Sequence, residues 1–133
     1  MYYIIETERF LKEPEVKEKR RYPRLHFDCI RAYLPGKEKP YDVLDISLKG
    51  CFIAMEDPPP PGTILPLELE LPGVGRIPVR ALVMHQGGLE PRGAGVLILE
   101  IEGELHHVYA KFLKALQIIH EARQLYDKIM SSR

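Results

Sequence analysis

The sequence predicts a mainly β domain followed by one long C-terminal helix, and three observations support this prediction. Six short segments between residues 25 and 102 either alternate apolar and polar side chains or form compact apolar runs. Turns rich in glycine and proline separate these segments. After residue 103 the apolar spacing changes to three- and four-residue steps, as in an amphipathic helix. Short strands joined by tight turns favour an antiparallel barrel or sandwich over a parallel sheet.

The first three predicted strands are residues 25–34, 41–47 and 51–55. The turn "PGKEKP" separates the first two strands, and Gly50 interrupts the chain between the second and the third. Residues 56–62 contain four consecutive prolines, which lack the N–H groups that an interior strand needs. This segment is therefore predicted to be a stiff exposed loop.

The three later strands, residues 64–72, 76–85 and 94–102, include the clearest alternation. In the first of them four leucines face one side and two glutamates the other, namely Leu65, Leu67, Leu69 and Leu71 against Glu68 and Glu70. In the second, Arg80 points outward and four apolar residues point inward, namely Ile77, Val79, Ala81 and Val83. These inward side chains are the predicted core.

Residues 104–130 carry the helical pattern, with apolar residues at Leu105, Val108, Tyr109, Phe112, Leu116, Ile119 and Tyr126. At about 1.5 Å per residue such a helix runs roughly 40 Å, which is longer than a small barrel is wide. It must therefore break, or its end must project and expose Tyr126 and Ile129. The simplest role of the apolar stripe is packing against the barrel, and the excess length leaves room for a partner protein or a homodimer.

These elements divide the chain into an N-terminal segment with a basic arm (1–24), a barrel (25–102) and a C-terminal helix (103–131). Residues 1–16 fit an edge strand or a short helix equally well. Pro23 disfavours a helix at Tyr22, so residues 17–24 are predicted to form an extended arm.

Composition narrows the functional classes. The 133 residues suit one domain, and 19 basic residues balance 19 acidic ones, so no net field attracts nucleic acid or membranes. The N-terminus lacks a basic signal-peptide region, and no apolar run approaches the roughly 20 residues that span a bilayer. Cys29 and Cys51 lie in apolar stretches and form no close pair, which indicates buried, reduced thiols. We therefore expect a soluble cytoplasmic protein.

Two local patterns point to an anionic ligand. Residues 17–24, "KEKRRYPR", hold five basic side chains in eight positions and include Arg20 and Arg24 in an Arg-x-x-x-Arg spacing. Downstream, residues 45–50 spell Asp-x-Ser-x-x-Gly at the end of a predicted strand. Each pattern is weak alone, but the two in this order, with a strand between them, are far more specific.

This combination resembles the PilZ domain, a bacterial receptor for the second messenger cyclic di-GMP, over roughly residues 18–102. A late Gly-x-Gly-Val strand at Gly93–Val96 adds to the resemblance. It implies a six-stranded antiparallel barrel with a C-terminal helix and a nucleotide ligand. The ligand-binding residues that it implies are Arg20, Arg21, Arg24, Asp45, Ser47 and Gly50, with Lys19, Gly93 and Gly95 as secondary candidates. The sequence itself contains no catalytic motif and no cluster of metal ligands, so we expect no cofactor, no metal and no enzymatic activity.

The chemistry of these residues suits that ligand. Arginine pairs bidentately with phosphate and with the O6 and N7 atoms of guanine, and its flat face stacks on bases. The Asp45 carboxylate can accept the N1–H and N2–H groups of guanine. Asp45 and Ser47, two residues apart on a strand, are expected to share a face. Gly50 is expected either to turn the chain with positive φ or to let the ligand approach the backbone.

The arm's own cations repel one another, so we expect it to be mobile until the ligand fixes it against the barrel, which would signal to an effector protein. Two alternatives remain open, namely a nucleotide-independent adapter and, disfavoured by the neutral charge, a nucleic-acid-binding barrel. His106 and His107 are adjacent on the helix and point about 100° apart, which disfavours one shared metal ion. The sequence leaves the effector, the affinity, the number of bound nucleotides and the oligomeric state open.

Overall fold

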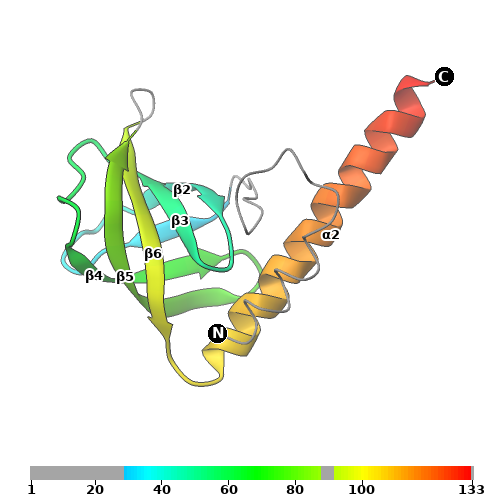
Figure 1. Ribbon diagram of the computed structural model, residues 1–133. Coiled ribbons are helices and arrows are strands. Elements are labelled where there is room, and N and C mark those ends of the chain that lie inside the picture. The colour runs from blue at the N-terminus through cyan, green and yellow to red at the C-terminus, as the bar shows by residue number, and fades with distance from the viewer. Residues whose placement is uncertain (1–28, 88–91, 133) are drawn as a thin grey trace.

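The strands of the protein close into one antiparallel barrel, with a helix running beside and beyond it (Figure 1). The computed structural model describes residues 29–87 and 92–132. The order around the barrel is β1-β2-β3-β6-β5-β4, so the barrel, and not the sandwich, is confirmed. The elements are β1 (Arg31–Tyr33), β2 (Tyr41–Ile46), β3 (Gly50–Ala54), β4 (Ile64–Leu71), β5 (Gly75–Gly87), β6 (Gly93–Ile101) and α2 (Leu105–Ser131).

The β4–β5 pair shows how the alternating pattern builds the core. Leu67 pairs with Val79 and Leu69 with Ile77, and all four side chains are buried. Burying one face of each strand removes apolar surface from water and fixes the pairing register, because a one-residue slip would expose that face. The predicted inward set is confirmed except that Leu65, near the start of β4, is only partly buried.

Strand β1 is shorter than predicted, because only Arg31–Tyr33 of residues 25–34 is a strand among the described residues. Pro35 has no N–H to continue a ladder, and Lys37 N–H closes a turn by donating to the carbonyl oxygen of Leu34 at 3.1 Å. Cys29 precedes β1 in a turn and is exposed, so the prediction that it is buried was wrong. Cys51, as predicted, is buried.

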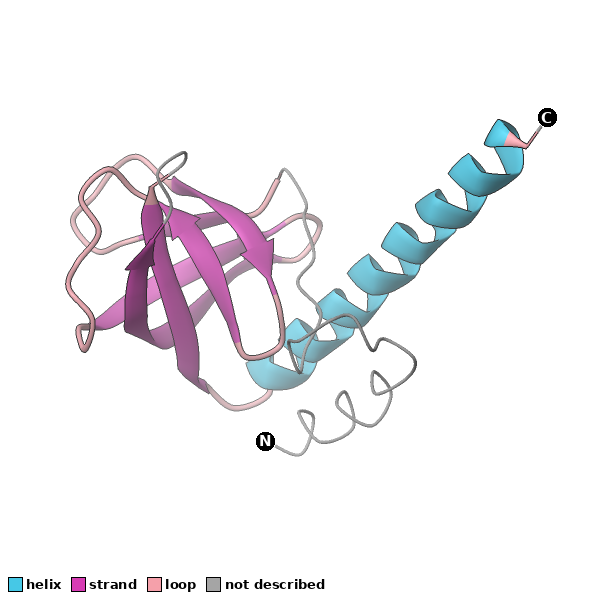
Figure 2. Ribbon diagram, turned by 45° about the horizontal axis from the view of Figure 1, so that its top comes forward, coloured by secondary structure: helices cyan, strands magenta, loops and turns pink. Residues whose placement is uncertain are grey.

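Helix α2 is unbroken over 27 residues. Its first half packs on the barrel through the buried side chains of Tyr109, Leu113 and Leu116. Its second half leaves the barrel and ends far from it (Figure 2). Of the two outcomes expected for so long a helix, the projecting end is therefore the one observed. No helix in the described part of the chain has the length and apolarity needed to cross a bilayer.

Candidate functional site

The structure describes only the strand-borne part of the predicted site. Arg20, Arg21, Arg24 and the secondary candidate Lys19 lie outside the described residues, as does the predicted arm. Asp45, Ser47, Gly50, Gly93 and Gly95 lie within them, on β2, the β2–β3 turn, β3 and β6.

A β-bulge in β2 determines where Asp45 lies. Val43 and Ile46 are both buried, although residues three apart on a regular strand would face opposite sides. The pairing with β3 shifts between Val43 and Asp45, which absorbs one extra residue. Regular alternation from Val43 would direct the Asp45 carboxylate into the apolar core. The bulge instead leaves Asp45 partly exposed on the outer face.

Asp45 belongs to a row of residues that crosses four strands. It pairs with Phe52 on β3, Phe52 pairs with Gly95 on β6, and Gly95 pairs with His85 on β5. The adjacent row across the same four strands consists of fully or nearly fully buried residues, namely Ile46, Cys51, Val96 and Val83. Because neighbouring rows point to opposite faces, the row from Asp45 to His85 lies on the outside of the barrel. We call these four residues the outer row.

Gly93 and Gly95 make room for aromatic rings on this face. A Cβ atom at Gly95 would collide with the His85 imidazole. One at Gly93 would collide with the backbone carbonyl oxygen of Ile53 on β3 and would lie 2.8 Å from Cε2 of Phe52. Both rings therefore lie over the backbone of β6. Phe52 and His85 were not predicted as site residues, because the pairing that aligns them with Asp45 depends on two register shifts that the sequence does not reveal.

Ser47 lies one residue beyond the end of β2, so the expectation that it shares a strand with Asp45 was wrong. It closes a tight turn with Gly50. The Ser47 N–H donates to the Gly50 carbonyl at 2.8 Å, and the Gly50 N–H donates to Ser47 Oγ at 3.3 Å. The β6 strand fixes this turn as well, because the Ile98 N–H donates to the Lys49 carbonyl at 2.7 Å.

Gly50 does not have the positive φ that was one of its two predicted roles; the described residues with positive φ are five other glycines. A Cβ atom at Gly50 would instead collide with the carbonyl oxygen of Val96 on β6. The close approach that requires glycine here is therefore that of the neighbouring strand.

Tyr109 of α2 connects the turn to the helix. Its hydroxyl donates to the Ser47 carbonyl at 2.7 Å, and the side chain is buried. Burial raises the pKa of the Tyr109 phenol well above its ordinary value of 10.0, and the neighbouring Cys51 raises it further. The phenol therefore remains protonated and able to donate at neutral pH. This hydrogen bond therefore links the Ser47–Gly50 turn directly to α2.

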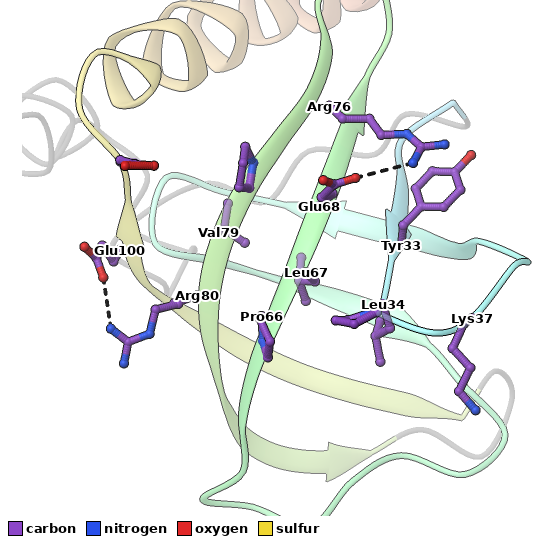
Figure 3. A pocket seen from close by; sticks show the side chains of 13 residues that line it. Tyr33, Leu34, Lys37, Pro66, Leu67, Glu68, Arg76, Val79, Arg80 and Glu100 are labelled. Carbon is purple, nitrogen blue, oxygen red and sulfur yellow. Dashed lines mark hydrogen bonds and ion pairs between the residues drawn. The ribbon is translucent and has the colours of Figure 1, made fainter.

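A hollow of about 610 Å³ lies elsewhere on the barrel, over β4 and β5 (Figure 3). Arg76 donates to Glu68 at 3.3 Å and lies 3.6 Å from the centre of the Tyr33 ring, and Arg80 donates to Glu100 at 2.9 Å. Its three basic and three acidic lining residues balance in charge. Neither this hollow nor a second one of about 690 Å³ near Arg92 is lined by Asp45, Ser47 or Gly50.

His106 and His107 of α2 are the two adjacent histidines for which a shared metal ion was disfavoured from the sequence. The rings of His106 and His107 lie edge to face at 83°, with their centres 5.7 Å apart. Within residues 29–87 and 92–132, no group of three or more His, Cys, Asp or Glu side chains is placed to hold a metal ion.

The described residues form a closed six-stranded antiparallel barrel with a C-terminal helix, and the Asp-x-Ser-x-x-Gly segment forms a turn closed by Gly50. The domain therefore belongs to the class of small antiparallel β-barrels that carry a C-terminal helix. The PilZ domain family matches residues 18–115, and the chain belongs to that family. The search of curated proteins gives no significant match.

Solved structures with the same fold include YcgR of Escherichia coli in complex with c-di-GMP, with a TM-score of 0.63 and 17% identity over 84% of this chain and 51% of that one. The Bacillus subtilis inhibitor of motility MotI/DgrA matches with a TM-score of 0.58 and 22% identity over 82% and 52%. The K. pneumonia MrkH–c-di-GMP complex matches with a TM-score of 0.54 and 20% identity over 80% and 55%. This chain thus spans about half the length of these proteins.

Proposed function

We propose that this chain is a receptor for cyclic di-GMP. The observation that carries the proposal is the PilZ match, because residues 18–115 include both the arginine-rich arm and the Asp-x-Ser-x-x-Gly turn. Two proteins of the same fold, YcgR and MrkH, are solved in complex with this nucleotide, which supports the choice of ligand. The ligand carries two phosphates and two guanines, and both groups suit the residues that the family motifs contain.

In the proposed complex, Arg20, Arg21 and Arg24 bind phosphate and guanine edges, with Lys19 adding positive charge. Asp45 accepts the N1–H and N2–H groups of one guanine. Ser47 and Gly50 supply the closed turn that holds Asp45 at the edge of the outer face. Gly93 and Gly95 contribute by leaving space over β6 for the two aromatic rings.

We extend the proposed site to Phe52 and His85. Both pair in the same outer row as Asp45, and His85 is exposed. A guanine whose edge is held by Asp45 can lie against the flat face of a neighbouring ring, and stacking on aromatic side chains is tolerant and favourable. Together these residues offer hydrogen bonding and stacking on one surface.

The proposed signal runs through Tyr109. Ligand binding at the turn changes the position of the Ser47 carbonyl, and the buried Tyr109 hydroxyl bonded to it passes the change to α2. The projecting half of α2 is then the surface read by an effector protein or by a second copy of the chain. We place this receptor in the cytoplasm, as the sequence predicts.

Isothermal titration calorimetry of the full chain tests the ligand. Cyclic di-GMP should bind saturably, and Asp45→Ala and Arg24→Ala should each weaken binding at least about thirtyfold, because each removes one partner of charge-assisted hydrogen bonds. Arg80→Ala, in the hollow of Figure 3, is the control and should bind as the parent does. GMP, cyclic AMP and single-stranded oligonucleotides should not replace the ligand. Absence of heat with cyclic di-GMP would overturn the proposal and favour a nucleotide-independent adapter.

A further inference from the structure

The projecting half of α2 exposes six large apolar side chains. They are Ile118, Ile119, Leu125, Tyr126, Ile129 and Met130, with Leu125 58% and Tyr126 63% exposed. The first half of the same helix buries its apolar side chains against the barrel. Figures 1 and 2 both show the second half extending past the barrel. A contiguous apolar surface of this kind on a soluble domain marks an interaction site.

Part of this apolar surface, including Ile119 and Tyr126, continues the stripe that packs on the barrel, and the rest lies on a different face of the helix. Successive residues of a helix are rotated by about 100°, so Ile118 and Leu125 point roughly opposite to Tyr109. Tyr109 is the most deeply buried residue of the helix. Packing against this barrel therefore cannot account for the face that carries Ile118, Leu125 and Ile129, which needs a different partner.

The spacing of the residues on this second face fits another helix. Ala115, Ile118, Ala122, Leu125 and Ile129 follow one another at steps of three, four, three and four residues, which is the a/d seam of a two-helix coiled coil. We call these five residues the seam. One side of the seam carries Ile119 and Tyr126, and the other carries Glu121 and Lys128.

The charges of Glu121 and Lys128 beside the seam indicate which partner helix fits and whether it runs parallel or antiparallel. We propose that the projecting half of α2 pairs with the same segment of a second copy of this chain, in antiparallel orientation. With Ala122 facing Leu125 of the partner subunit, each Glu121 lies beside Lys128 of the partner subunit, and Ile119 lies beside Tyr126 of the partner subunit. A two-fold axis then produces two equivalent ion pairs. In a parallel pair Glu121 would meet Tyr126 of the partner subunit, and neither charge would find its opposite.

The expected dimer is weak, because the seam spans only about 22 Å at 1.5 Å per residue. A short two-helix interface of this kind falls at the small end of the size range, where complexes are weak and transient. Its formation needs no nucleotide, so its test is independent of cyclic di-GMP binding.

Sedimentation equilibrium of the full chain without nucleotide, over a range of concentrations, tests this dimer. The parent should show a monomer–dimer equilibrium, and Leu125→Glu should raise the dimer dissociation constant at least about thirtyfold by placing a charge in the seam. Gln124→Glu is the matched control, because it adds the same charge one residue away from the seam and should leave the constant unchanged. Circular-dichroism melting should show that the folded monomer of both variants is intact.

A charge exchange tests the orientation. Glu121→Lys alone and Lys128→Glu alone should each weaken the dimer about fivefold, and the double variant should restore it. A dimer insensitive to both exchanges would overturn the antiparallel arrangement. A parent that remains monomeric would overturn the dimer itself. A melting temperature that falls with Leu125→Glu at a concentration where the parent is monomeric would also overturn it, because the seam would then be covered within one chain.

Discussion

The Ser47–Gly50 turn and the hollow of Figure 3 hold their polar groups in different ways. The turn is tied to two other elements by backbone acceptors, with Tyr109 bonded to Ser47 and Ile98 bonded to Lys49. The hollow holds ion pairs between adjacent strands, and the side chains of Arg80 and Glu100 are 53% and 57% exposed. Exposed pairs contribute about 0–1 kcal/mol, whereas a buried acceptor that loses its donor costs about 1–3 kcal/mol. The size of the hollow therefore does not indicate an energetic link between its polar groups and the rest of the fold. The turn, in contrast, is bonded directly to α2 through Tyr109.

The largest expected effect is at Gly50. Gly50→Ala places a methyl group against the backbone carbonyl of Val96, which cannot move aside as a side chain would. We expect the free energy of unfolding to fall by about 3 kcal/mol in urea denaturation. The control is Gly87→Ala, whose methyl group would meet only the His85 ring at 3.5 Å. Equal effects of the two substitutions would contradict the close β3–β6 approach.

The next effect is at Tyr109. Tyr109→Phe keeps the ring but leaves the buried Ser47 carbonyl without its 2.7 Å donor, so stability should fall by about 2 kcal/mol. Tyr126→Phe, at an exposed position of the same helix, should leave stability unchanged. If the two variants melt alike, the hydrogen bond does not hold the turn to the helix.

Alkaline pH should lower the stability that Tyr109 contributes. The pKa of Tyr109 is raised in the folded protein, so its contribution is fully present below the ordinary value of 10.0. Above that pH the unfolded chain loses the phenol proton and the folded one retains it, so stability falls by up to about 1.4 kcal/mol per pH unit. Denaturation at pH 9 and pH 11 should show a smaller loss for Tyr109→Phe than for the parent. An identical loss would mean that other groups cause the alkaline effect.

The smallest effects are expected in the hollow. Arg80→Ala and Glu100→Ala each break the 2.9 Å pair, and each should change stability by no more than about 0.5 kcal/mol. Raising the salt concentration should reduce even this difference, because exposed charges are screened. A loss above 1 kcal/mol in either variant would remove the contrast between the two regions.

The barrel was predictable because β4 and β5 alternate regularly, and each inward position from Leu67 to Val83 obeys the period of two. The prediction for Asp45 and Ser47 was less successful, since it assumed an unbroken strand. The bulge at Leu44 depends on how β2 pairs with β3, and the turn at Ser47 depends on its backbone hydrogen bonds to β3 and β6. That information lies in the pairing of distant segments and not in the local pattern.

The same limit explains why Phe52 and His85 escaped prediction. His85 lies ten residues before Gly95 in the sequence, and its alignment with Gly95 depends on a second register shift, between Val83 and His85. Tyr109 was predicted only as a core residue, and its apolar ring fits that role. Its hydroxyl bond to Ser47 joins positions 62 residues apart, which no local spacing indicates.

Amide NMR of the ¹⁵N-labelled full chain, titrated with cyclic di-GMP, tests the central claim most directly. We predict that the largest shifts occur at the Ser47–Gly50 turn and at Phe52 and Gly95, and that they extend to the residues of α2 around Tyr109. The amides of Glu68, Arg76 and Arg80 in the hollow should remain unchanged. Shifts centred on the hollow, or a turn that does not respond to saturating ligand, would contradict the account.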